Sequence, residues 1–250
     1  MSAKTQEFSS VWTRPQRQRR DQPALSRDQI VTEALTLLDT EGIDALSMRK
    51  LGSRLNAGAT SLYTHVTNKD EILELVVDAA FGEPRVPEDT TRDSWRADMT
   101  ALAREIRATL LRHPWMLSVM TGAGLAYLGP NLMRVSEAML GIFEKAGFDD
   151  DASDRATNAI FAYIIGSTST EAAMLNAVTH SGLTEQEWFG EMMAAAEHAS
   201  KPYPRMHRRY VTQRDLDTEQ AREDFFGQEL GLILDGLEVR GRTKKPAAQA

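Results

Sequence analysis

Hydrogen-bonding side chains are concentrated in one short segment, from Ala59 to Val66. On a helix, Leu62 and Val66 are four residues apart and can both face inward, which leaves five side chains largely outward: Thr60, Ser61, Tyr63, Thr64 and His65. Hydroxyl, methyl and polar ring groups on an exposed helix can discriminate base edges in the major groove of DNA. We therefore expect these five residues to contact bases or the nearby backbone, with packing of Tyr63 and His65 against neighbouring helices as the alternative.

The segments around this one have the pattern of a helix-turn-helix. Ser26, with Gln29 three residues later, forms a capping box that starts a first helix, and Ser47 caps a second, shorter helix. A tight turn follows at 56–58, and Asn68 begins a fourth helix with a wide apolar stripe. Two short helices joined by such a turn and braced by longer ones form a DNA-reading unit, in which three residues would anchor the duplex: Ser47, Arg49 and Lys69.

The stretch at 46–75 resembles the DNA-binding signature of the tetracycline-repressor (TetR) family. Arg-Lys-Leu at 49–51, Leu-Tyr-x-His-Val at 62–66 and Asn-Lys at 68–69 match that signature in type and spacing. A second resemblance lies near the end of the chain, where the residues at 225–238 are similar to the closing dimerisation helix of the tetracycline-repressor type.

The resemblance implies a ligand-responsive transcriptional repressor that binds a near-palindromic, double-stranded DNA operator as a homodimer. A small effector, apolar or aromatic, would release the operator by favouring another spacing of the two DNA-reading heads, with the fourth helix carrying the coupling. The resemblance assigns DNA contacts to the same eight positions. This sequence departs from the family pattern at three positions that offer little side-chain hydrogen bonding: Gly58, Ala59 and Thr64. Sequence specificity is therefore expected to rest on few contacts. No residue is carried over from the magnesium-chelating site of the tetracycline repressor.

Helical periodicity extends over most of the chain, and the alternation typical of strands is almost absent. The expected fold is all-α, with an N-terminal three-helix helix-turn-helix DNA-binding domain and a larger C-terminal helical bundle that forms a ligand pocket and a dimer interface. The expected domains are a basic, flexible arm over 1–25, a helix-turn-helix domain over 26–82, a ligand-binding and dimerisation domain over 94–240, and a disordered tail over 241–250. The arm either threads the minor groove or stays solvated. In the larger domain we expect helices at 94–112, shortly after Pro114, at 130–146, at 152–178 and at 219–239.

Thioether and aromatic side chains are frequent in the larger domain, and such groups adapt to apolar guests. The set expected to line an effector pocket is Trp115, Met116, Met120, Tyr127, Met133, Phe143, Phe161 and Met174. The alternative for each member is an ordinary place in the core, because methionine and aromatic residues at helical spacing usually pack there.

An apolar stripe at helical spacing runs along the last helix through Phe226, Leu230 and Leu234, and Gly227 and Gly231 lie beside it. Each glycine costs about 1 kcal/mol inside a helix, so two of them suggest a close approach of another backbone. We expect these five residues at a two-fold dimer interface, because two DNA-reading heads require symmetry. The alternative is packing within one subunit.

The composition is that of an ordinary globular protein, with 250 residues, of which 42% are hydrophobic and 26% charged. The absence of cysteine excludes disulfides, thiol nucleophiles and thiolate metal sites. A net charge of −7 argues against a broad basic surface, so any DNA contacts must be local. The N-terminus lacks a signal-peptide pattern, and prolines and glycines interrupt the uncharged run at 113–133, so we expect a cytoplasmic protein without a membrane span.

Catalytic signatures are missing from the sequence. Gly-Ala-Gly at 122–124 has no third glycine and no preceding strand, and the acidic run at 149–154 lacks the glycine and the terminal glutamate of a calcium-binding EF-hand loop. There is no HExxH, P-loop or nucleophile elbow, and His113 is interpreted as a helix-end residue. We expect no enzyme, no cofactor and no metal site. Two alternatives stay open: a helical small-molecule-binding enzyme, and an interaction protein without specific DNA binding.

Overall fold

Helices make up the regular secondary structure of the described part of the chain, which comprises residues 25–121, 129–213 and 218–241 of the computed structural model. The predicted all-α fold is therefore confirmed. The chain divides into two compact units, one ending at Ala146 and the other beginning at Gly147. None of the helices in the described ranges is long and apolar enough to cross a membrane. The arm before residue 25 and Tyr127 of the expected pocket lie outside the described residues.

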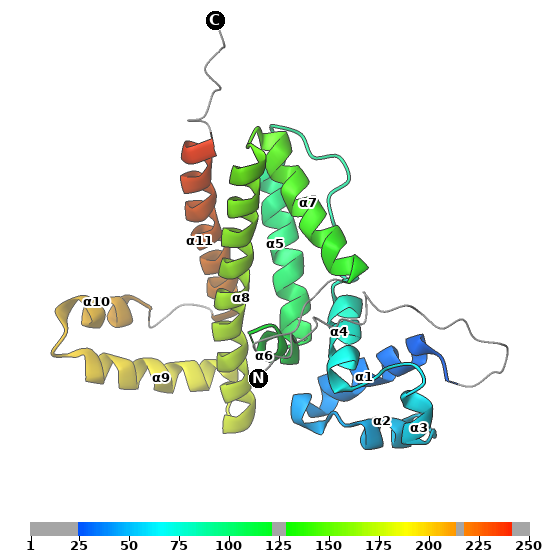
Figure 1. Cartoon of the computed structure of the whole chain (residues 1–250). Helices are drawn as coiled ribbons and strands as arrows, with labels where there is room; N and C mark the ends of the chain where they lie inside the picture. Colours follow the sequence, from blue (N-terminus) through cyan, green and yellow to red (C-terminus); the bar gives the residue numbers. More distant parts are fainter. Residues whose placement is uncertain (1–24, 122–128, 214–217, 242–250) are drawn as a thin grey trace, which may run out of the picture. The chain divides into compact units, whose positions relative to one another are not determined.

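The first unit begins with five helical segments: α1 (Arg27–Glu41), η1 (Ile43–Ala45, a 3₁₀ helix), α2 (Met48–Arg54), α3 (Ala59–Leu62) and α4 (Lys69–Ala80). The predicted capping box of α1 is present, because the backbone N–H of Gln29 donates to Ser26 Oγ over 3.1 Å and that of Ser26 donates to Gln29 Oε1 over 2.8 Å. Helix α1 packs against α4, and α2 packs against α3 (Figure 1). Their apolar faces form a common core that includes Ile30, Leu37, Leu38, Leu51, Ile72, Val76 and Phe81.

The turn between α2 and α3 depends on Asn56, whose φ is +49°. Asparagine is one of the few residues besides glycine that tolerate this backbone region. Helix α3 ends at Leu62 and not at the predicted Val66, because residues 63–65 continue as turns, held partly by the His65 N–H donating to the Leu62 carbonyl over 2.8 Å. Leu62 and Val66 are nevertheless fully buried, as their spacing predicts.

Three further helices complete the first unit: α5 (Trp95–Arg112), α6 (Trp115–Thr121) and α7 (Pro130–Ala146). Their bounds agree with the predicted ones, since Ser94 is the residue that precedes α5 as its N-cap. Helices α5 and α7 lie side by side and pack against each other (Figure 1). The segment at 83–94 between α4 and α5 contains no helix, as its prolines predict.

The second unit contains α8 (Asp150–Ser181), α9 (Glu185–Ser200), α10 (Pro204–Gln213) and α11 (Thr218–Gly241). Helix α11 packs against α8, whereas α9 and α10 form a hairpin that branches away from that pair (Figure 1). Arg222 of α11 donates to Glu171 of α8 over 3.0 Å and also pairs with Glu185 of α9, so one guanidinium joins three helices.

The sequence pattern did not indicate α9 or α10, and α8 is longer at both ends than the predicted 152–178. A local signal for α9 was present. Thr184 and Glu187 form a capping box, and the hydrogen bonds from Thr184 hold the pKa of the Glu187 carboxyl below its ordinary value. Few residues of this hairpin are buried, and α10 consists mostly of polar residues.

Candidate nucleic-acid interface

The polar side chains of α3 and the turns after it form an exposed surface in the first unit. Tyr63 is 54% exposed and His65 is half-buried, while the other three predicted base-contacting residues are exposed: Thr60, Ser61 and Thr64. Leu62 and Val66 anchor the segment from below, because both are fully buried. One short, well-anchored segment therefore presents all five side chains that the sequence assigned to base or backbone contacts.

The three cations of α2 differ in their partners. Lys50 pairs with Glu41, and Arg54 pairs with Glu33 and, over 3.2 Å, with Glu41. The hydrogen bond from Lys50 lowers the pKa of the Glu41 carboxyl, and the hydrogen bond to Glu33 raises the pKa of Arg54. Arg49 is exposed and forms no ion pair within the described ranges of the chain. Carboxylates of α1 thus pair with two of these cations, and among the described residues no carboxylate pairs with Arg49.

The other two predicted duplex anchors stand at helix starts. Ser47 is the exposed N-cap of α2, and its hydroxyl accepts from the backbone N–H of Lys50 over 3.2 Å. Lys69 is the first residue of α4, and its ammonium donates to the Ile43 carbonyl over 3.3 Å. Lys69 therefore braces η1 against α4, in addition to any role at the surface.

An open cavity of about 730 Å³ adjoins the helix-turn-helix. It is bounded by the first turns of α1 and by the turn between α2 and α3. Ser61 is the one residue that this cavity shares with the predicted DNA-contacting set, and its lining contains no member of the predicted effector set.

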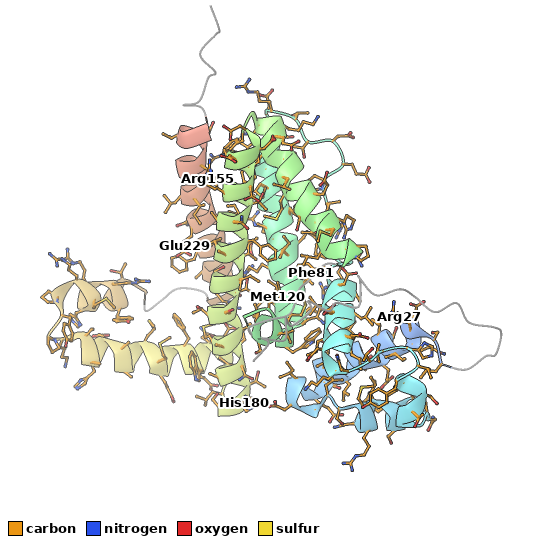
Figure 2. All side chains as sticks on the ribbon, viewed as in Figure 1. Arg27, Phe81, Met120, Arg155, His180 and Glu229 are labelled. Carbon is orange, nitrogen blue, oxygen red and sulfur yellow. The ribbon has the colours of Figure 1, made fainter. Side chains whose placement is uncertain are left out.

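Helices α4 and α7 cap each other. Asp78 of α4 accepts from the backbone N–H groups of Asn131 and Leu132 over 2.9 and 3.1 Å, so its carboxylate caps the N-terminus of α7 from a neighbouring helix. A Cβ atom at Gly129 would lie only 2.1 Å from Asp78 Oδ1, so this approach requires glycine. In return, Arg134 of α7 donates over 3.1–3.4 Å to three carbonyls at the C-terminal end of α4, where Figure 2 labels Phe81: those of Phe81, Gly82 and Pro84.

A second polar cluster joins α1 and the end of α4 to the corner between α5 and α6. His113, the C-cap of α5, is 3% exposed, with Nδ1 2.7 Å from Asp39 Oδ1 and Nε2 3.0 Å from Glu83 Oε1. The indole N–H of Trp115 donates to the same Asp39 oxygen over 2.7 Å, and Arg112 pairs with Glu83. The helices that brace the DNA-reading segment are thereby attached to α5, α6 and α7 through charged groups.

Two family models match the chain. Residues 30–76 match the model described as bacterial regulatory proteins, tetR family, and residues 86–240 match the model described as tetracyclin repressor-like, C-terminal domain. The chain belongs to the TetR family. The predicted family and the predicted class of function, a DNA-binding transcriptional regulator and not an enzyme, are confirmed.

Relatives of this TetR-family chain are similar over most of its length. An HTH-type transcriptional regulator of Saccharopolyspora erythraea is 42% identical over 189 residues, which cover 76% of this chain and 75% of the relative. The HTH-type transcriptional repressor DrrR1 of Streptomyces coeruleorubidus is 34% identical over 219 residues, which cover 87% of this chain and 78% of DrrR1. Among solved structures, the TetR-family protein ActR of Streptomyces coelicolor, in complex with actinorhodin, has a TM-score of 0.75 and 26% identity, covering 89% of this chain and 99% of ActR.

The residues predicted for the effector pocket of this TetR-family protein are distributed over both units. In the first unit, Trp115 and Met116 are buried on α6, Met120 (labelled in Figure 2) is half-buried there, and α7 carries the exposed Met133 and the buried Phe143. In the second unit, two half-buried members lie on α8: Phe161 and Met174. The hydrogen bond to Asp39 gives Trp115 a core role in joining α6 to α1.

Three of the five residues predicted for the dimer interface are buried within the single chain: Phe226, Leu230 and Leu234. Tyr163 of α8 donates its hydroxyl to the Phe226 carbonyl over 2.9 Å, and the two ring centroids lie 5.3 Å apart. This face of α11 therefore packs against α8 of the same subunit. Gly227 and Gly231 are half-buried, and a Cβ at Gly231 would meet nothing within 4 Å, so no other described part of the chain approaches Gly231 closely.

The residues that attach α1 and α4 to α5, α6 and α7 were hardly indicated by the sequence pattern. His113 was expected at a helix end and does cap α5. The groups that it and its neighbours contact are 29 to 76 positions away in the chain, and no local pattern pairs them. The one available signal was an acidic residue, Asp78, within the otherwise apolar second half of α4.

Proposed function

We propose that this regulator is a ligand-responsive repressor that binds a near-palindromic operator as a homodimer and is released by a small apolar or aromatic effector. DNA binding is supported by the exposed polar segment after α2 together with Arg49, a neighbouring cation with no ion pair in the described ranges. Phosphate contacts position a protein on DNA, and base contacts specify the sequence. The proposed contacts are Ser47, Arg49, Thr60, Ser61, Tyr63, Thr64, His65 and Lys69.

A second apolar stripe on α11 supports the homodimer. Phe225, Leu232 and Val239 are 42%, 72% and 68% exposed, and each is seven residues, or about two helical turns, from the next. Helix α8 also exposes several small residues that allow a close approach: Ala159, Ala162, Gly166 and Ala173. We propose that these exposed faces pack against a second copy of the chain. The three buried members of the predicted interface set, Phe226, Leu230 and Leu234, then belong to the layer beneath, which holds α11 on α8.

The proposal of a small-molecule effector rests on the side chains of α6, α7 and α8 and on the relatives. Methionine and aromatic residues on these helices offer adaptable apolar contacts. ActR, which has the same fold, was solved in complex with actinorhodin. An effector that prefers one spacing of the two heads lowers operator affinity by the ratio of its affinities for the two spacings. A hundredfold release requires a preference of about 2.7 kcal/mol.

The proposed function is tested by titrating short duplexes that tile the DNA flanking the gene for this protein, followed by fluorescence anisotropy at fixed salt. We expect one near-palindromic duplex to bind saturably and at least about a thousandfold more tightly than a scrambled duplex. Tyr63→Ala is expected to weaken that binding by about tenfold, since it removes an exposed side chain from the reading segment.

The matched control is Tyr203→Ala, which removes another exposed tyrosine, from the segment between α9 and α10. This variant should bind the operator like the native chain. Equal, weak binding to every duplex, unaffected by Tyr63→Ala, would show that this chain does not read an operator through the helix-turn-helix.

A further inference from the structure

His113 is buried, and each of its two ring nitrogens faces a carboxylate. Nδ1 lies 2.7 Å from Asp39 Oδ1, and Nε2 lies 3.0 Å from Glu83 Oε1, while the residue is 3% exposed. The two carboxylates flank opposite sides of the ring and do not converge on one point. Consistent with this, the described residues contain no group of histidine and carboxylate side chains that could hold a metal ion.

The neighbouring donors determine which atoms carry protons. The Trp115 indole N–H, which can only donate, contacts the same Asp39 oxygen as the ring, and Arg112, also only a donor, pairs with Glu83. Each carboxylate is therefore an acceptor toward a second group, as an ionised carboxylate is. A neutral imidazole has one N–H and leaves its other nitrogen lone pair against a carboxylate oxygen, so both contacts are hydrogen bonds only when the ring is the doubly protonated imidazolium.

The ring joins elements that the proposed function needs to keep in register. Asp39 lies in the last turn of α1, and Glu83 lies three residues after the end of α4. These two helices pack against each other and support the helix-turn-helix, whereas His113 belongs to the corner between α5 and α6. A cation at the C-terminal end of α5 is also favoured by the carbonyl groups of that helix end.

We infer that His113 is a positioning residue of this repressor, whose imidazolium holds the DNA-reading head in the orientation that the operator requires. The inference rests on the proposed function, because a fixed head orientation matters when two heads must meet two half-sites together. Losing the second ring proton replaces one hydrogen bond by a repulsive contact and loosens the head, which must then be ordered on binding. Operator affinity consequently depends on the protonation of a ring that does not touch DNA.

Within the described part of the chain, the charged and polar groups in hydrogen-bond contact with the ring and its two carboxylates come from four segments. They are Asp39 from α1, Glu83 from the segment after α4, Arg112 from α5 and the indole of Trp115 from α6. Interactions that favour the charged ring are present at low pH and disappear as the pH rises. Operator affinity of the native protein is therefore expected to fall by about tenfold when a rise in pH removes the second ring proton.

The test compares the pH profile of operator binding for the full-length native chain, His113→Gln and His198→Gln. His198 is an exposed histidine on α9, so its replacement should leave the native profile unchanged. His113→Gln should bind more weakly at the lower pH and lose most of the slope. An unchanged slope in His113→Gln would overturn the proposal, because the dependence would then belong to other groups, such as His65.

A DNA-free measurement covers the case in which His113→Gln folds poorly. The ¹⁵N spectrum of the histidine rings in the native protein should show one ring with both nitrogens protonated, which loses its second proton at lower pH in Asp39→Asn. A neutral single tautomer for His113 throughout the native titration would contradict the proposed imidazolium bridge between Asp39 and Glu83. Because this spectrum needs no operator, a result against the imidazolium bridge is distinguishable from a result against the proposed repressor function.

Discussion

Arg49 and Lys50 are adjacent cations on α2 with different surroundings. Lys50 is held by Glu41 of α1, whereas Arg49 is exposed and has no ion pair in the described part of the chain. Arg49→Ala is therefore expected to weaken operator binding by about tenfold and to reduce the slope of log affinity against log salt by about 1. Lys50→Ala should change both quantities much less, because this ammonium is already neutralised by the protein. Anisotropy titrations at four or five salt concentrations measure both quantities.

Equal effects of the two substitutions would contradict this assignment, since they would show that Lys50 leaves Glu41 to reach the DNA.

The exposure of Arg49 and of the five residues after α2 was predictable, because buried partners at helical spacing determine which side faces outward. The ion pairs that Lys50 and Arg54 form with Glu41 and Glu33 were not predictable. Both carboxylates are also surface residues in the sequence pattern, and only the packing of α1 on α2 brings them close to the two cations.

At the scale of elements, the exchange of caps between α4 and α7 is the strongest connection that the sequence did not reveal. Asp78→Ala leaves the N–H groups of Asn131 and Leu132 without their buried acceptor, and it is expected to lower the free energy of unfolding by about 3 kcal/mol. The control is Asp149→Ala, which removes the exposed N-cap of α8 and should cost about 1 kcal/mol. Chemical denaturation followed by circular dichroism measures both costs.

Hydrogen exchange locates the effect of Asp78→Ala. The amides of Asn131 and Leu132 should exchange faster in this variant, while those at the start of α8 should not change. If both variants cost the same and the exchange at the start of α7 is unaffected, Asp78 is not the cap that holds α7.

Elements with strong local signals were predicted well. Ser26, Ser47 and Asn68 cap the expected helices, and Pro130 begins α7 at the expected residue. Helices α9 and α10 were missed because few of their side chains are buried and α10 is mostly polar, although the capping box of α9 was visible in the sequence. The cap of α7 could not be predicted, since its acceptor comes from a residue 53 positions earlier in the chain.

At the scale of the whole molecule, the two apolar faces of α11 have separate roles. Leu234 is buried within the chain, whereas Leu232 is 72% exposed on the proposed dimer face. Leu232→Glu is therefore expected to convert a dimer into a monomer with native helix content, because it places a charge in an apolar interface. Leu234→Ala should instead destabilise the fold by about 2–5 kcal/mol. Sedimentation velocity and thermal unfolding distinguish the two results.

A dimer that persists in Leu232→Glu would show that another surface joins the two copies. The buried position of Leu234 could not be deduced from the stripe alone, because an apolar stripe packs equally well against its own subunit or a partner. The exposed stripe at Phe225, Leu232 and Val239 is visible only once the first stripe has been assigned to the fold.

Operator reading by two symmetry-related heads is tested most directly by comparing an intact operator with the same duplex in which one half-site is replaced by random sequence. Two symmetry-related heads predict that two copies of the chain bind the intact operator and that loss of one half-site weakens binding by about a hundredfold or more. Binding of one copy, or an affinity unchanged by the replacement, would contradict a dimeric repressor that reads DNA with its two helix-turn-helix heads.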